Sequence, residues 1–185
     1  MSTTTTQSSD PAIVRIENAR LSFPALFEPR GFEDSKPAYQ ATLILNKKTH
    51  AALIKKLQAA SAHVKQEQWK GKTPKLLSDT FRDGSEKPDL DGYGDDVVFL
   101  SCRSTKRVPV VARDLTPLTA EDGKPYAGCY VNATVRLWAQ DNKYGKRINV
   151  ALRAIQFLKD GEPFGEKPAD VESEFESLPD EESVV

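Results

Sequence analysis

The sequence predicts a small, mainly β protein: a single five-stranded barrel with one inserted α-helix. Short segments in which apolar and polar residues alternate, the pattern of half-buried strands, recur along the chain. One segment has helical spacing, and it lies among the strands instead of alternating with them, which favours a barrel over a doubly wound sheet. With 185 residues and 38% hydrophobic content, the chain can bury one core.

The first two strands are expected before the helix. Residues 12–23 carry apolar side chains at β-like spacing, and Pro24 and Pro29 then interrupt the pairing, so a loop is predicted there. Residues 39–45 alternate and predict a second, well-buried strand, in which Gln40 and Thr42 lie on the face opposite Leu43.

The inserted helix has recognisable ends. Thr49 can cap its start, and Gly71 and Pro74 end it. Its apolar stripe consists of Leu53, Leu57, Ala60 and Val64. Trp69 lies well off this stripe, so we expect it to follow the helix or to face outward. An exposed indole in a lysine-rich stretch is a candidate for stacking on a nucleic-acid base, and packing against a loop is the alternative.

The second half of the chain supplies the remaining strands. Residues 82–96 are polar and predict a long loop, and residues 97–102 and 106–112 follow as one irregular strand or two. Residues 129–139 predict the clearest strand, because their alternation is unbroken. A hairpin turn then leads to a return strand whose inward residues are Ile148, Val150, Leu152 and Ala154. The alternation loses phase within residues 155–158, which predicts a β-bulge.

Charge divides the chain into a basic body and an acidic tail. Residues 1–159 hold 25 Lys+Arg against 17 Asp+Glu, whereas residues 160–185 hold one Lys and ten acids. The predicted organisation is a disordered N-terminus at residues 1–11, a barrel domain at 12–159 and a disordered acidic tail at 160–185. A basic body indicates a polyanionic partner, and an ordinary soluble domain with a solubilising tail is the alternative.

Several familiar sites lack essential residues. The segment Gly71-Lys72-Thr73 would need Gly at position 66 to complete a P-loop, and the chain has Gln66 there. An EF-hand register that begins at Asp89 reaches Leu100 where a glutamate ligand is required. The two histidines and two cysteines form no metal-ligand or nucleophile pattern. We therefore expect no metal, no cofactor and no catalytic residue.

The N-terminus and the cysteine content bear on location. The first ten residues have neither a basic start nor an apolar run, so no secretory signal is predicted. No segment approaches the roughly 18 consecutive apolar residues of a transmembrane helix, so no membrane span is predicted. Cys102 and Cys129 form no CxxC motif. A reducing cytoplasm is the expected compartment.

The remaining candidate site is the polar face of the final hairpin. Aromatic rings stack on unpaired bases while Lys and Arg neutralise the phosphates between them, so this combination is typical of single-stranded nucleic-acid binding. The predicted base-stacking residues are Tyr130, Trp138, Tyr144 and Trp69. The predicted phosphate-binding residues are Arg103, Lys106, Arg107, Arg136, Lys143, Lys146, Arg147 and Arg153. Burial of Tyr130 and Trp138 beneath a loop or a partner subunit is the structural alternative.

Three segments closely resemble a bacteriophage family formerly described only as a domain of unknown function. They are Leu21-Ser-Phe-Pro-Ala-Leu-Phe-Glu-Pro29, Gly123-Lys-Pro-Tyr-Ala-Gly-Cys-Tyr-Val-Asn-Ala133 and Asp160-Gly-Glu-Pro-Phe-Gly165. The characterised members are single-stranded DNA-binding proteins, and the resemblance spans about residues 12–166. It implies an OB fold like that of the replication single-strand binders of short-tailed phages, a role in phage replication or recombination, and no catalysis.

The resemblance also implies that the acidic C-terminus contacts replication partners and competes with DNA. The residues expected to do so are Asp180, Glu181 and Glu182. Many single-strand binders end in an aromatic residue after the acids, whereas this chain ends in Val185.

We therefore hypothesise a non-enzymatic protein that coats single-stranded DNA with little sequence preference in the cytoplasm of an infected bacterium. A phage polymerase, helicase or nuclease is the expected class of tail partner, and the protein is expected to be a monomer or homodimer. The alternatives are an RNA-binding or annealing module on the same barrel and a protein-interaction component of the virion.

Overall fold

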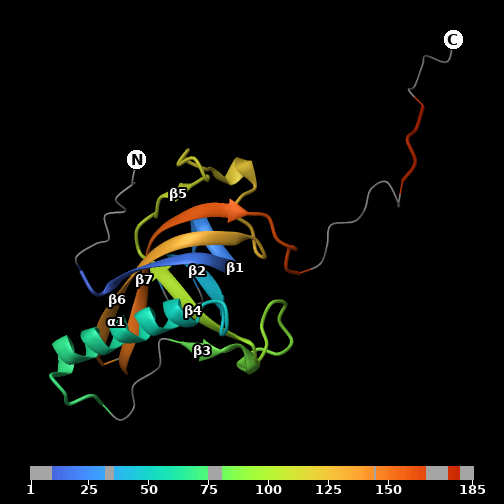
Figure 1. The fold of residues 1–185 in the computed structure, drawn as a ribbon. Coiled ribbons are helices and arrows are strands. Elements are labelled where there is room, and N and C mark those ends of the chain that lie inside the picture. Colours follow the sequence, from blue (N-terminus) through green and yellow to red (C-terminus); the bar gives the residue numbers. More distant parts are fainter. Residues whose placement is uncertain (1–9, 32–35, 75–80, 144, 166–174, 180–185) are drawn as a thin grey trace, which may run out of the picture.

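The computed structural model describes residues 10–31, 36–74, 81–143, 145–165 and 175–179. One sheet contains all the strands in the order β3-β4-β2-β1-β6-β7-β5 (Figure 1). The strands are β1 (Ile13–Arg30), β2 (Ala38–Asn46), β3 (Arg82–Asp83), β4 (Val97–Ser104), β5 (Val110–Val111), β6 (Tyr130–Asn142) and β7 (Gly145–Lys159). The helices are α1 (Ala51–Trp69) and the short 3-10 helices η1 (Gly84–Glu86) and η2 (Ala120–Asp122).

Strand β4 closes the sheet into a barrel by pairing with β7. The two strands are parallel, with Cys102 opposite Val150 and Arg103 opposite Ala151. The barrel therefore runs β1-β2-β4-β7-β6 and returns to β1. A five-stranded barrel of this kind is the architecture of the OB fold, so the predicted fold class is confirmed.

One core fills the barrel, and α1 covers one end of it. The inward residues of the barrel strands include Leu21, Leu43, Leu100, Val131, Leu137, Val150 and Ile155. Leu57, Ala60 and Val64 of α1 join the same core, as the predicted helical stripe requires. In Figure 1, α1 lies across the lower end of the barrel, next to the hairpin of β6 and β7.

The start of α1 differs from the prediction. His50, not Thr49, occupies the N-cap position, and no side chain caps the helix. Asn46 instead organises the preceding turn, because its Oδ1 accepts hydrogen bonds from the backbone N–H groups of Lys48 and Thr49 at 2.9 and 3.0 Å. Sequence reasoning missed this turn because Asn46 ends a strand.

Strand β1 is longer than predicted. It continues through Pro24 to Arg30, with register shifts against β2 between Ser22 and Ala25 and again before Arg30. The irregularity includes Phe23, whose φ is 46°. Proline is tolerated in a strand where the ladder is already interrupted, so the loop predicted after residue 23 is wrong.

The phase slip in β7 comes earlier than predicted. Leu152 pairs with Val135 and Ala154 with Thr134, so Arg153 is an extra residue and Ala154 faces outward. A second shift lies between Phe157 and Lys159, inside the predicted range. Sequence alternation alone does not show which residue the partner strand skips.

The predicted loop at residues 82–96 is partly ordered by packing and by charge. Asp83 in β3 accepts hydrogen bonds from Lys47 Nζ at 2.7 Å and from the backbone N–H of Ser85 at 2.9 Å, and together these contacts lower the pKa of Asp83 to about 2. Tyr93 and Phe164 pack on a second small cluster, formed by Ile44, Val97 and Phe99 outside the barrel.

Residues 160–165 are held against the barrel. Arg20 Nη2 donates to the carbonyl of Glu162 at 2.9 Å, and its guanidinium lies 4.3 Å from the ring centroid of Phe164. The backbone N–H of Phe164 donates to Ala127 O at 3.0 Å. The packed body therefore reaches Gly165, past the domain end predicted at residue 159. Of the N-terminal segment predicted to be disordered, residues 1–11, residues 1–9 lie outside the described residues. Asp10 is described, and its Oδ1 accepts a hydrogen bond from the backbone N–H of Ala12 at 2.9 Å. None of the described helices is long and apolar enough to cross a membrane.

The reactivity of the two thiols provides a test of burial in this core. Cys102 and Cys129 are both buried and free, and burial raises both thiol pKa values, that of Cys129 to about 11. Because only the thiolate reacts, we expect the native protein at pH 8 to be labelled by a thiol reagent far more slowly than the unfolded protein. With a reagent that releases a coloured product on reaction, the increase in absorbance measures the rate of thiol labelling. Fast labelling of native protein would contradict the burial of these residues.

Candidate nucleic-acid interface

The hairpin of β6 and β7 has one buried and one exposed face. Leu137, Ile148 and Val150 point into the core. Cross-strand pairing places Trp138 opposite Asn149 on the other face, and Trp138 is 46% exposed. The indole is therefore accessible on the face that the alternation predicts.

Closure of the barrel brings another arginine to this face. Ala151 of β7 pairs with Arg136 of β6 on one side and with Arg103 of β4 on the other. Paired residues share a face and neighbouring strands lie 4.7–4.9 Å apart, so the two arginine backbones are about 10 Å apart. Both arginine side chains are exposed, and only the methyl group of Ala151 lies between them on the sheet.

The β-bulge adds Arg153 to the same surface. As the extra residue of β7, Arg153 has no cross-strand partner, and its side chain is exposed. A bulge redirects a side chain and bends the strand, and bulges are common next to functional sites. At the other end of the strand, Arg147 lies opposite Gln140 and is also exposed.

These residues form one surface along β7, which we call the arginine stripe. Its members are Arg147, Trp138, Arg136, Arg103 and Arg153. The connection after β4 continues beside it, because Val110 pairs in parallel with Ile155. Lys106 and Arg107 belong to this connection and are exposed. All five predicted site residues of the stripe therefore come together.

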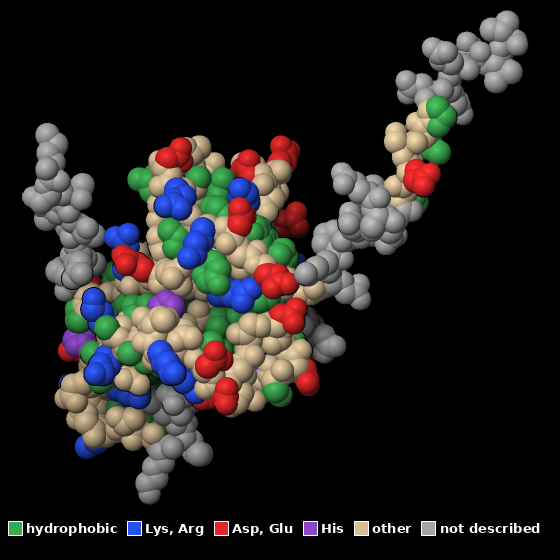
Figure 2. Space-filling view, turned by 45° about the vertical axis from the view of Figure 1, so that its right-hand side comes forward, with side chains coloured by type: hydrophobic (Ala, Val, Ile, Leu, Met, Phe, Trp, Pro, Cys, Tyr) green, Lys and Arg blue, Asp and Glu red, His purple; other side chains and the backbone are tan. Residues whose placement is uncertain are grey.

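Charges within the stripe are weakly compensated. Arg136 Nε lies 3.7 Å from Asp10 Oδ2, and both side chains are well exposed. A surface ion pair of this kind contributes about 0–1 kcal/mol, so it does not prevent Arg136 from contacting an anion. In the view of Figure 2, Lys and Arg side chains gather mainly at the lower left and Asp and Glu side chains mainly to the right.

Lys146 does not lie on the predicted face of the hairpin, and Trp69 does not face outward from the helix. Lys146 pairs with Asp141 on the side of the hairpin that faces α1, and its Nζ lies 4.0 Å from Asp141 Oδ1. Trp69 packs against the core at the end of α1, and its Nε1 donates to Asp141 Oδ2 at 3.0 Å. The expectation of an outward Trp69 is therefore corrected: its indole packs against the barrel and the hairpin.

Tyr130 belongs to a different part of the surface. It lies eight residues from Trp138, about 27 Å along the strand. The ring centroid of Tyr130 is 5.7 Å from the Arg20 guanidinium and 4.9 Å from Lys159 Nζ. Gly161 approaches the ring so closely that an added Cβ would lie 2.9 Å from it. Tyr130 is half-buried here, and it forms no common platform with Trp138.

The remaining predicted residues lie at the hairpin turn and in the tail. Lys143 is exposed in the turn. Tyr144 and the tail residues Asp180, Glu181 and Glu182 lie outside the described residues.

Sequence reasoning missed two polar neighbours of the stripe. Gln40 lies opposite Arg103 on β2, and Gln140 accepts a hydrogen bond from Asn149 Nδ2 at 2.8 Å. Alternation within each strand places both residues outward. Nothing in the sequence indicates that Gln40 lies beside Arg103, since only the pairing of β2 with β4 brings them together.

The described part of the chain contains no evident metal-binding site. It contains no group of three or more His, Cys, Asp or Glu residues placed to hold an ion.

A hollow of about 500 Å³ on the outer side of β1 and β2 is lined by both Arg20 and Asp96, so its charge is mixed.

Comparison with known proteins identifies the family. Residues 12–185 match the family described as Enterobacter phage Enc34, ssDNA-binding protein. The chain belongs to this family. It is 37% identical over 175 residues to protein p50 of Acyrthosiphon pisum secondary endosymbiont phage 1, an alignment that covers 89% of this chain and 93% of that protein.

Two solved structures of phage proteins share the fold. The single-stranded DNA-binding protein of bacteriophage Enc34 in complex with ssDNA is 33% identical, with a TM-score of 0.75 over 83% of this chain and 90% of that one. The bacteriophage T7 single-stranded DNA binding protein gp2.5 is 16% identical, with a TM-score of 0.50 over 94% of this chain and 98% of its own. At that identity the second likeness shows the fold alone.

Single-tryptophan variants separate the two indoles. In W69F only Trp138 emits, and in W138F only Trp69 emits. Because Trp138 is exposed and Trp69 packs against the core, we expect W69F to emit at longer wavelength and to be quenched more steeply by acrylamide. Stern–Volmer plots measure this difference, and equal slopes would contradict the packing of Trp69.

Proposed function

We propose that this chain binds single-stranded DNA with little sequence preference and covers it during phage replication or recombination. The observation that carries the proposal is the arginine stripe, in which an exposed indole lies among four arginines on the outer face of an OB barrel. Membership of the Enc34 family supports it, since a family structure is a complex with ssDNA.

The chemistry of the stripe suits an unpaired strand. A base stacked on Trp138 contributes about 1–3 kcal/mol, and stacking accepts any base because each has a π-face. Arg103 and Arg136, on either side of Ala151, bind phosphates, and Arg147 and Arg153 extend the contact in both directions along β7. Duplex DNA hides its base faces, so it gains only the phosphate contacts.

We further propose that the protein has no catalytic activity. The free cysteines support this: raised pKa values keep Cys102 and Cys129 as thiols, and both are buried away from any substrate. The family description names binding and no reaction. We place its action in the cytoplasm of the infected bacterium, where phage DNA is copied.

The acidic tail is proposed to act as a competitor for the stripe. Residues 166–185 contain eight Asp or Glu residues and one Lys, whereas the stripe is cationic. A tethered polyanion lowers the apparent DNA affinity and speeds exchange. When DNA displaces it, the tail becomes available to a replication protein such as a polymerase, helicase or nuclease.

Oligonucleotide titration tests the binding proposal. Addition of oligo-dT is expected to quench the W69F variant, which retains Trp138, and to leave the emission of W138F nearly unchanged. Affinity falls steeply with salt because each neutralised phosphate adds about 0.7 to the slope of log K against log salt. A slope near zero would reject phosphate binding. Equal affinity for duplex DNA would reject stacking, and preference for RNA of the same length would favour the RNA alternative.

Truncation after Gly165 tests the tail. It keeps residues 160–165, which pack on the barrel, and removes the acidic segment. We expect tighter oligo-dT binding than for the full chain, with the largest gain at low salt. The length-matched control, D180N/E181Q/E182Q, should show part of that gain. Unchanged affinity in the truncated protein would remove the tail from the mechanism.

A further inference from the structure

The C-terminal end of α1 is attached to the tip of the β6–β7 hairpin. Trp69, the last residue of the helix, donates its Nε1–H to Asp141 Oδ2 at 3.0 Å. Lys70 then ends the helix in a left-handed conformation, and its backbone N–H bonds to Gln66 O. Lys72 follows, with its backbone N–H bonded to Trp69 O at 2.9 Å. Both lysines are therefore held at the end of the hairpin.

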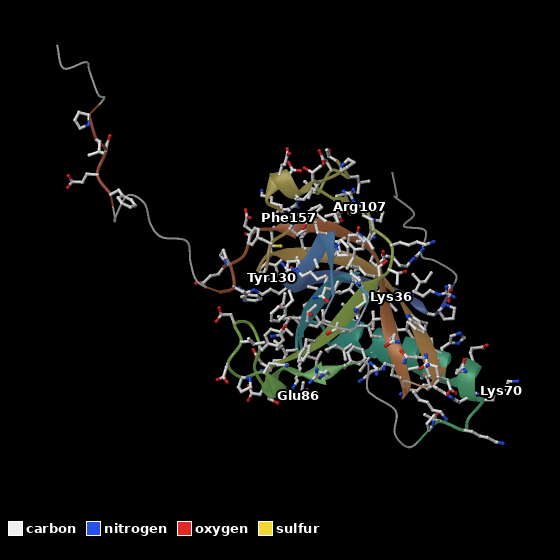
Figure 3. All side chains as sticks on the ribbon, turned by 180° about the vertical axis from the view of Figure 1, so that it is seen from behind. Lys36, Lys70, Glu86, Arg107, Tyr130 and Phe157 are labelled. Carbon is white, nitrogen blue, oxygen red and sulfur yellow. The ribbon has the colours of Figure 1, made fainter. Side chains whose placement is uncertain are left out.

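Positive charge gathers where these two elements meet. Lys70 and Lys72 are exposed on the helix side. The hairpin side carries Lys143, Lys146 and Arg147, all exposed. In Figure 3, Lys70 lies beside the hairpin tip and Arg107 lies toward the other end of the barrel. The stripe lies on the outer face of the hairpin and the helix end on the side of Lys146, so basic groups lie on both sides of the hairpin tip.

We infer that the DNA path continues from the arginine stripe over the hairpin tip to Lys70 and Lys72, which bind the phosphates of nucleotides beyond the one stacked on Trp138. This inference rests on the proposed function. Trp138 and Asn142 are four residues apart, about 13 Å along β6, so a strand leaving Trp138 toward the hairpin turn soon reaches the end of the sheet. The basic groups available there come from the turn and from α1.

Asp141 limits the affinity of this extension. It is an acidic residue between the cations of the tip, with Lys146 at 4.0 Å and the Trp69 donor at 3.0 Å. An asparagine at this position keeps an oxygen that accepts from Trp69 and removes the negative charge. The junction between helix and hairpin therefore survives the substitution while its charge becomes more positive.

Two lengths of DNA separate the extension from the stripe. A single OB fold covers about 4–16 nucleotides, so an oligo-dT of about 5 nucleotides fits the stripe and one of about 16 reaches the helix end. For K70A/K72A we expect weaker binding of the long oligonucleotide and a salt slope reduced by about 1.4, for two lost phosphate contacts. Binding of the short oligonucleotide should be unchanged.

The matched control is K55A/K56A. These exposed lysines lie on the same helix, about 21 Å from Lys70, and their removal changes the net charge equally. We expect both lengths to bind this control as they bind the unmodified protein. D141N should bind the long oligonucleotide more tightly, a gain that a folding defect cannot produce.

The outcomes distinguish the two proposals. If K70A/K72A binds each oligonucleotide as tightly as the unmodified protein does, the proposed extension is overturned and the binding role of the stripe is unaffected. Equal losses in K70A/K72A and K55A/K56A would also overturn it, since net charge would then explain the effect. Failure of the unmodified protein to bind either length would instead reject the proposed function.

Discussion

The parallel contact between β4 and β7 closes the barrel, and the arginine stripe exists because of that closure. Cys102 and Val150 meet on the inner side of this contact and belong to the core. Arg103 and Ala151 meet on its outer side, next to Arg136. The same strand pairing therefore buries apolar side chains on its inner side and aligns arginines on its outer side. Loss of the inner packing would also separate the arginines.

Local irregularities of the barrel strands also shape the surface proposed to bind DNA. The bulge at Arg153 places an additional cation on the outer surface without changing the inward positions of Leu152 and Ile155. At the opposite side, Arg20 holds Phe164 and the carbonyl of Glu162, which attaches the start of the tail to the barrel. The described residues that precede the acidic segment therefore lie on the side of Tyr130 and not on the side of Trp138.

Hydrophobic periodicity predicted the elements well where one face of a strand or helix is buried. The alternation in residues 129–139 separated inward Leu137 from outward Trp138, and the helical stripe contained Leu57 and Val64, both buried. The same approach failed where packing overrides local pattern. Pro24 did not end β1, and the slip in β7 fell on Arg153 because register depends on the partner strand.

Composition and alternation by themselves determined the mainly β class, the outward position of Trp138 and the separation of a basic body from an acidic tail, because each can be read along the chain without knowing which strands pair. Tertiary structure alone decided which outward residues are neighbours. Trp138 and Tyr130 share a face of one strand yet lie far apart, whereas Arg103 and Arg136 lie on different strands and flank the same alanine. The physical reason is that a side chain's face follows from the period of its own strand, while its neighbours follow from barrel closure, which pairs segments distant in the chain.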